Sequence, residues 1–277
     1  MLQRLIRAIH PATPLERDLA LQCVLSAFAT GTFITGTAVY FTQVVGLTGP
    51  QVGLGMSISA AVTLVLQMPM GRLADHVGPR TLWVWASALE ALLYFVWPFI
   101  GGLAGFIAML SVLAVVETAG RNARNIYRIA VFDRANRVRA NAYMRAARNV
   151  GYTLGAGVSG VALGLGVRAV AAIPLVTALL LLGNAAMIAL MLPAITRGSS
   201  PSGQAPAGDE HVDAAPAAWR NTGFVVLALC NGALASNQVL LNVVVPLWLV
   251  ERTDAPHALL AWLFGTNTVL AVALQVR

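Results

Sequence analysis

Two glutamates lie inside long apolar stretches of the sequence, where a charge is costly. Glu90 lies near the middle of stretch 82–100, and Glu117 lies in stretch 102–121, one helical turn before Arg121. A carboxylate at the centre of a bilayer costs on the order of 2.5–3.5 kcal/mol, so it is a functional candidate by default. A carboxyl group at that depth is suited to bind and release a proton, which predicts a proton-coupling role for both. Two alternatives stay open: Glu90 as a hydrogen-bonded packing residue, and Glu117 in an i,i+4 ion pair with Arg121.

The sequence lacks the residue patterns that several kinds of enzyme require. All 18 cationic side chains are arginine, which excludes a P-loop nucleotide site and a lysine Schiff base. The sequence contains no His-Glu-x-x-His, no Gly-x-Ser-x-Gly and no cysteine–histidine cluster. Cys23 and Cys230 both lie in apolar runs, and the four histidines are scattered. We therefore expect no catalytic residue, no metal ion and no cofactor.

A glycine-rich segment at 155–160 fits the Gly-x-Gly-x-x-Gly pattern of dinucleotide sites. That pattern needs a strand before it and a soluble helix after it. Here it lies within an apolar stretch, where close packing of helices explains it better.

The composition is that of a membrane protein. Of the 277 residues, 58% are hydrophobic and only 10% are charged, and the mean hydropathy is +0.74; a soluble domain has about 25% charged residues. A helix needs about 20 mostly apolar residues to cross the hydrocarbon core. The stretches that meet this requirement are 18–43, 50–70, 82–100, 102–121, 146–167, 169–192, 221–248 and 257–276. The sequence thus predicts an all-α polytopic membrane protein with eight transmembrane helices.

The arginines predict how the chain is oriented in the cytoplasmic membrane. Basic loops stay on the cytoplasmic side. If the N-terminus is cytoplasmic, 16 of the 18 arginines lie inside and only Arg168 and Arg252 lie outside. We therefore predict that both termini are cytoplasmic. The run Arg121–Arg148 holds eight arginines against Asp133 alone, which predicts a solvated inner loop or one that contacts acidic lipid headgroups.

A polar linker and an internal repeat divide the chain. Residues 196–220 are rich in small and polar residues and predict a flexible cytoplasmic linker. A shift of 207 residues places Cys230 on Cys23, and so the seventh span on the first. This repeat predicts a six-helix bundle in 1–195 and the first two helices of a second bundle in 221–277. Since four more spans follow in the first copy, we expect the second bundle to be incomplete in this chain.

The segment between the second and third spans carries a motif. It reads Gly71-Arg72-Leu73-Ala74-Asp75-His76-Val77-Gly78-Pro79-Arg80. This segment resembles the signature loop of the major facilitator superfamily, Gly-x-Leu-Ala-Asp-x-x-Gly-x-Arg, and it lies at the same place among the spans. A second likeness begins at Asp133, includes Arg139 and continues through residues 149–155; it resembles the stretch of that family that enters the fifth helix. The resemblance implies two six-helix bundles that rock about a central site, which gives alternating access.

The motif predicts a conformational latch. Its glycines permit tight turns, while Asp75 near the membrane boundary needs a partner. Arg121 and Arg124 lie on the same side of the membrane and would supply one, so that the ion pair holds one conformation and breaks in the other. The alternative is a solvated loop whose arginines only set the orientation. The latch residues we predict are Gly71, Asp75, Gly78, Arg80, Arg121 and Arg124.

Polar residues gather in the first and seventh spans. Asn and Gln side chains in hydrocarbon must face protein or water. Because the repeat makes these two spans equivalent, we predict a polar cavity between them; hydrogen bonds between helices are the alternative. The candidate substrate contacts are Thr35, Asn231, Asn237 and Gln238.

The sequence therefore predicts a secondary active transporter rather than an enzyme. The resemblance implies that a small molecule is moved by alternating access, with proton-coupled efflux as the leading hypothesis. A metabolite uniporter or symporter and a truncated remnant that transports nothing are the alternatives. The expected partners are a small-molecule substrate, membrane lipid and protons, and no nucleic acid.

Overall fold

The described part of the chain is built from helices. The computed structural model describes residues 13–194, 222–240, 244–253, 256, 259–260, 262–263 and 265–266, and no strand occurs among them. The elements are α2 (Pro14–Val39), η1 (Tyr40–Val44), α3 (Gly49–Val77), α4 (Pro79–Val96), η2 (Trp97–Phe99), α5 (Gly102–Val131), α6 (Arg134–Leu165), α7 (Val167–Ala171), α8 (Ile173–Met191), α9 (Thr222–Val239) and α10 (Val245–Arg252). The all-α prediction is confirmed.

Several described segments are long and apolar enough to cross a membrane. They are Pro14–Val44, Gly49–Gln67, Pro79–Phe99, Gly102–Val131 and Val167–Met191. Nearly all of the predicted fifth span lies within α6, and α9 covers much of the seventh. The linker 196–220 and most of the eighth span lie outside the described residues, so the count of eight and the division into two bundles stay predictions.

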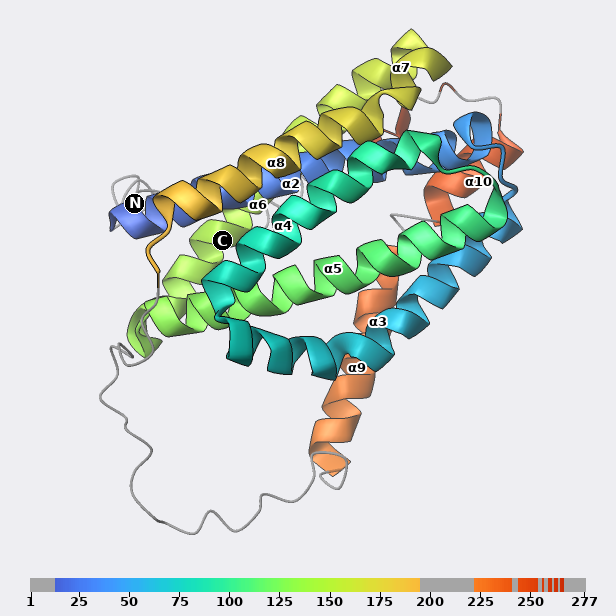
Figure 1. Ribbon diagram of the computed structural model, residues 1–277. Coiled ribbons are helices and arrows are strands. Elements are labelled where there is room, and N and C mark those ends of the chain that lie inside the picture. Colours follow the sequence, from blue (N-terminus) through green and yellow to red (C-terminus); the bar gives the residue numbers. More distant parts are fainter. Residues whose placement is uncertain are drawn as a thin grey trace.

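The helices of residues 14–191 pack side by side in an order that differs from their order in the chain (Figure 1). Neighbours in contact run α6, α2, α8, α4, α5 and then α3, and α10 touches α2. This order brings α2, α4, α5, α6 and α8 around one common space, which holds the candidate site.

Large apolar side chains cover both the inside and the outside of this bundle. One buried cluster is aromatic and includes Phe33, Tyr94 and Trp97, with the ring centroids of Phe33 and Tyr94 4.8 Å apart. A second buried cluster surrounds Trp83 and Tyr127. Many large apolar side chains are also exposed on the outside, as expected for surfaces that face lipid rather than water.

The predicted loop between the second and third spans is a one-residue break between helices. The first helix, α3, continues to Val77, and α4 begins at Pro79. Gly78 between them has a φ of +93°, a value that only glycine adopts without strain. Pro79 suits the first position of a helix because its missing N–H has no intrahelical partner there. The motif therefore turns the chain sharply instead of forming a loop.

The prediction that the arginine run 121–148 is a loop is wrong. Helix α5 continues to Val131 and α6 begins at Arg134, so nearly all of the run is helical. Alanine and arginine, which dominate the segment, are strong helix formers. Arg137 donates hydrogen bonds of 2.9 Å to the carbonyls of Phe132 and Ile129, which satisfies backbone groups at the end of α5.

Glycines let α2 and α6 approach closely. At Gly155 a Cβ atom would lie 2.5 Å from the backbone nitrogen of Thr32, and at Gly31 it would lie 2.9 Å from the carbonyl oxygen of Tyr152. Gly151 meets the backbone of α2 in the same way. The glycine-rich segment therefore serves helix packing.

Candidate functional site

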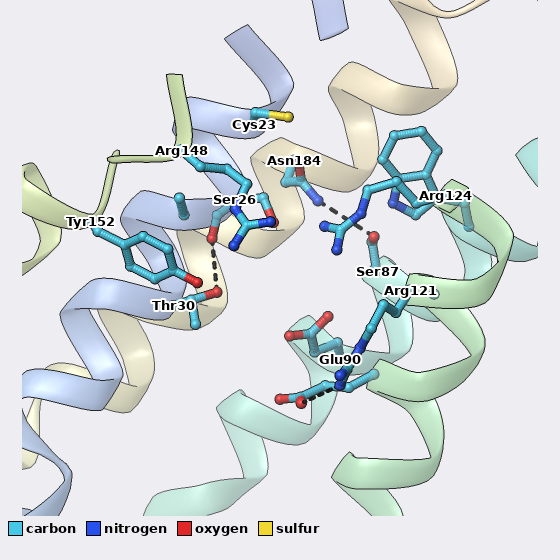
Figure 2. A pocket seen from close by; sticks show the side chains of 14 residues that line it. Cys23, Ser26, Thr30, Ser87, Glu90, Arg121, Arg124, Arg148, Tyr152 and Asn184 are labelled. Carbon is cyan, nitrogen blue, oxygen red and sulfur yellow. Dashed lines mark hydrogen bonds and ion pairs between the residues drawn. The ribbon is translucent and has the colours of Figure 1, made fainter. Parts of the chain in front are cut away.

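A cavity of about 420 Å³ lies among five helices of the bundle (Figure 2). Its volume is in the range of small-molecule sites. It takes residues from every helix that surrounds the common space described above. The lining residues are Cys23, Ser26, Ala27 and Thr30 of α2, Trp83, Ser87 and Glu90 of α4, Glu117, Gly120, Arg121 and Arg124 of α5, Arg148 and Tyr152 of α6, and Asn184 of α8.

Glu90 and Glu117, the two glutamates found in apolar stretches of the sequence, both line this cavity. Glu117 and Arg121 form the i,i+4 ion pair, with 4.0 Å between Oε2 and Nη2, and 39% of the Glu117 side chain is exposed. Glu90 reaches the cavity from α4 and interacts electrostatically with Glu117, Arg124 and Arg121. Glu117 is thus partly exposed at the cavity. Two carboxyl groups from different helices therefore share one set of guanidinium groups.

The guanidinium group of Arg124 has no ion-pair partner among the residues whose side chains the structure describes. Its Nε atom is buried and makes no hydrogen bond within the described residues. Other arginines lie within electrostatic range, among them Arg121, Arg128 and Arg148. The cavity wall of α5 therefore carries concentrated positive charge.

The opposite wall adds another cation. In Figure 2, Arg148 and Tyr152 of α6 lie on one side of the cavity, and Arg121 and Arg124 lie on the other. The guanidinium carbon of Arg148 lies 5.9 Å from the centre of the Tyr152 ring, which is a cation–π distance. Arg148 thus faces the cavity against an aromatic ring rather than a carboxylate.

A chain of polar side chains ties the cavity walls together. Gln22 donates a hydrogen bond of 2.9 Å to Asn184, and Asn184 donates one of 3.4 Å to Ser87. Arg128 donates to the sulfur of Cys23 at 2.8 Å, and Cys23 lies 3.7 Å from the Gln22 amide oxygen. These contacts link α5, α2, α8 and α4. They hold the helices around the cavity at fixed positions.

The predicted latch residues occupy different surroundings. Arg80 donates hydrogen bonds of 2.7 Å and 2.5 Å to the carbonyls of Leu192 and Ala189, so it caps the end of α8. Gly71 lies within α3 and Gly78 forms the break described above. Arg121 and Arg124 line the cavity. The side chain of Asp75 lies outside the described residues, and the latch stays a prediction.

The two predicted substrate contacts whose side chains the structure describes, Thr35 and Asn231, do not line this cavity. Thr35 is buried in α2, one turn or more beyond the lining residue Thr30, and Asn231 is exposed on α9. The side chains of Asn237 and Gln238 lie outside the described residues. Their contact with substrate stays a prediction.

Sequence reasoning missed several polar lining residues, among them Asn184, Arg148 and Tyr152. Asn184 lies within an otherwise strongly apolar span, a signal that was available because amides in hydrocarbon must face protein or water. Arg148 and Tyr152 are one helical turn apart at the start of the fifth span, but the positive charge was assigned to membrane orientation.

Comparisons with known proteins place the chain in a family. The family model of the Major Facilitator Superfamily matches residues 19–276, nearly the whole chain. No curated protein matches it significantly. Members of the matched family are multi-pass membrane transporters rather than enzymes, in agreement with the apolar helices and the internal cavity. The chain therefore belongs to the major facilitator superfamily and is a polytopic membrane transporter.

Proposed function

We propose that this transporter is a secondary active carrier that moves a small molecule by alternating access, with Glu90 and Glu117 as its proton-coupling pair. The observation that carries the proposal is the shared cavity. Carboxyl groups of α4 and α5 interact there with each other and with Arg121 and Arg124. Carboxyl groups that exchange partners and protons inside a membrane domain are the usual parts of a proton relay.

Partner exchange around Glu117 supplies a coupling step. When Glu117 is ionised, it pairs with Arg121. A proton on Glu117 would abolish that pair and leave the guanidinium group free for another anion, Glu90 or substrate. The other groups that face this pair are Arg124 on α5, Arg148 and Tyr152 on α6, Cys23 on α2, Ser87 on α4 and Asn184 on α8. Protonation therefore changes which groups the arginines bind, and such a change can bias a conformational equilibrium.

Efflux by proton antiport is the first transport mode to test. Uniport or symport of a metabolite is the alternative. These modes differ in proton movement. An antiporter moves protons in the direction opposite to its substrate, a symporter moves them in the same direction, and a uniporter moves no protons.

The test uses the full chain in liposomes that contain a pH-sensitive dye. A panel of small cationic, neutral and anionic solutes is added under an imposed pH gradient, and both solute and proton fluxes are recorded. We expect Glu90→Gln and Glu117→Gln to lose proton flux and the response of solute flux to the gradient. Asp133→Asn is the matched control, because this exposed cap position lies outside the cavity and accepts either residue.

Two results would contradict the proposal. Proton flux at the wild-type level in both glutamine variants would exclude these residues as the coupling pair. Absence of solute flux across the whole panel, from a chain that is folded and inserted, would exclude transport by this chain alone.

A further inference from the structure

We infer that the cavity binds a small oxyanion, a carboxylate or a phosphate, between Arg124 and Arg148. The inference rests on the proposed function for the cavity's role as a transport site. It goes further because it assigns the charge class of the substrate and the two side chains that recognise it.

The state of Arg124 is the first argument. A buried polar atom without a partner costs free energy, and the cost is larger for a charged group. The Nε atom of Arg124 is such an atom, and Arg121, the next arginine on the same wall, is already paired with Glu117. An oxyanion in the cavity would give Arg124 the partner that the described residues do not give it.

The placement of Arg148 is the second argument. Arg124 and Arg148 lie on opposite sides of the cavity (Figure 2). Arg148 is held against the Tyr152 ring, which leaves its N–H groups available to a solute. A planar guanidinium group matches the paired oxygens of a carboxylate or phosphate. Two guanidinium groups on facing walls can therefore hold one oxyanion from both sides.

The balance of charge is the third argument. Among the described residues, the lining contains three arginines, Arg121, Arg124 and Arg148, and two glutamates. Even with both glutamates ionised, one positive charge is left over. A cation would meet this excess, whereas an anion would neutralise it.

A small solute fits the cavity better than a lipid headgroup does. The space of about 420 Å³ is lined by residues of five helices, and Trp83, Ser87 and Asn184 form part of its wall. Ser87 and Asn184 also offer neutral polar groups beside the cations. A whole phospholipid, with its acyl chains, exceeds a space of this volume.

The same arrangement links the anion to the proton. Ionised Glu90 competes with a bound anion for Arg124, and the negative charges of Glu90 and Glu117 both oppose an anion in the same cavity. A proton that neutralises either of them removes its opposition to the anion, so the proton and the anion bind in the same state. By linkage each strengthens the binding of the other. An anionic substrate therefore favours symport over antiport.

Binding to the purified full chain in an uncharged detergent tests the inference. The probes are inorganic phosphate, benzoate and the uncharged benzoate analogue benzamide, each titrated by calorimetry. We expect both anions to bind more tightly than benzamide. Arg124→Gln and Arg148→Gln should weaken anion binding by about 10- to 100-fold, because a hydrogen bond to a charged group is lost. Glu90→Gln should tighten it, and Arg168→Gln, an exposed position on α7, should leave it unchanged.

The outcomes separate this inference from the proposed function. Equal binding of benzoate and benzamide, or wild-type anion affinity in both arginine variants, would overturn the anion site even if proton flux persists. Absence of proton coupling by the wild-type protein in the liposome assay, together with intact anion binding, would overturn the coupling role and leave the anion site standing.

A parallel titration with phosphatidylglycerol tests whether the anion is part of a lipid. Tight binding of that lipid without any binding of the free anions would overturn the small-solute assignment. A melting temperature close to wild type in each variant shows that lost binding is not lost folding.

Discussion

Replacing Gly155 with alanine tests whether backbone contact between α2 and α6 shapes the cavity. In the variant the new Cβ atom would lie 2.5 Å from the backbone nitrogen of Thr32 and 2.6 Å from the carbonyl oxygen of Phe28. Carbon atoms pack at about 3.5–4.0 Å. Both neighbours belong to the backbone of a helix and cannot turn aside as a side chain can. The two helices must therefore separate locally by about 1 Å.

The magnitude follows from two opposing effects. Overpacking in a well-packed interior costs typically about 1–3 kcal/mol. Alanine in place of glycine within a helix gains about 1 kcal/mol. Gly157 on the same helix supplies the matched control, because a Cβ atom there would meet nothing within 4 Å. Both variants share the helix gain, so Gly155→Ala should be less stable than Gly157→Ala by roughly 1–3 kcal/mol.

Unfolding in detergent, followed by circular dichroism against a chemical denaturant, measures that difference. A second readout is binding of benzoate, because α2 and α6 supply Thr30 and Tyr152 to the cavity and their separation would change the spacing of its walls. Equal stability of the two alanine variants would refute the reasoning, because the close approach of α2 and α6 would then place no steric constraint on residue 155.

Further variants test the contacts that hold the cavity walls. Arg80→Met removes two hydrogen bonds at the end of α8 and should lower the free energy of unfolding by about 1–3 kcal/mol, measured by denaturation. Asn184→Leu leaves the buried Gln22 amide without its acceptor and should cost a similar amount, of which the double variant with Gln22→Leu should recover part. Glu16→Gln weakens the 3.0 Å pair with Arg139; the cost should be about 1 kcal/mol or less, and it should shrink in high salt if the pair is electrostatic.

The helices could be predicted from the sequence better than their ends could. Long apolar runs identify spans because a helix must cross about 30 Å of hydrocarbon. The ends depend on local chemistry instead. Thr13 caps α2 by accepting a hydrogen bond of 3.1 Å from the Glu16 backbone, and Gly78 breaks the chain between α3 and α4. Helix α5 passes the end of its apolar run because Ala and Arg are strong helix formers even where the sequence is no longer apolar.

The candidate site could be predicted only in part, for a related reason. Their position inside long apolar stretches was enough to identify Glu90 and Glu117 as functional candidates. It could not show that they share a cavity, because a helix that is apolar all round gives no signal of which face meets which neighbour. The partners of α4 in the bundle, α5 and α8, are set by packing contacts between distant parts of the chain.

The spacing of the polar residues contains a signal that hydropathy conceals. On α5 the residues Glu117, Arg121, Arg124 and Arg128 follow one another at intervals of four, three and four. This spacing places them on one face of a helix. The lining residues of α4, at 83, 87 and 90, and of α2, at 23, 27 and 30, repeat at the same spacing.

A one-residue displacement turns a side chain by about 100° and so removes it from that face. Asn122, the residue after Arg121, shows this directly: it donates to the carbonyl of Gln67 on α3 instead of facing the cavity. The rule that basic residues mark the cytoplasmic side counts arginines without regard to face. It therefore gives the same weight to Arg124, which lines the cavity, and to Arg137, which caps the end of α5. Periodicity within the arginine run separates those two roles, since only a stripe at helical spacing can form one wall of a binding site.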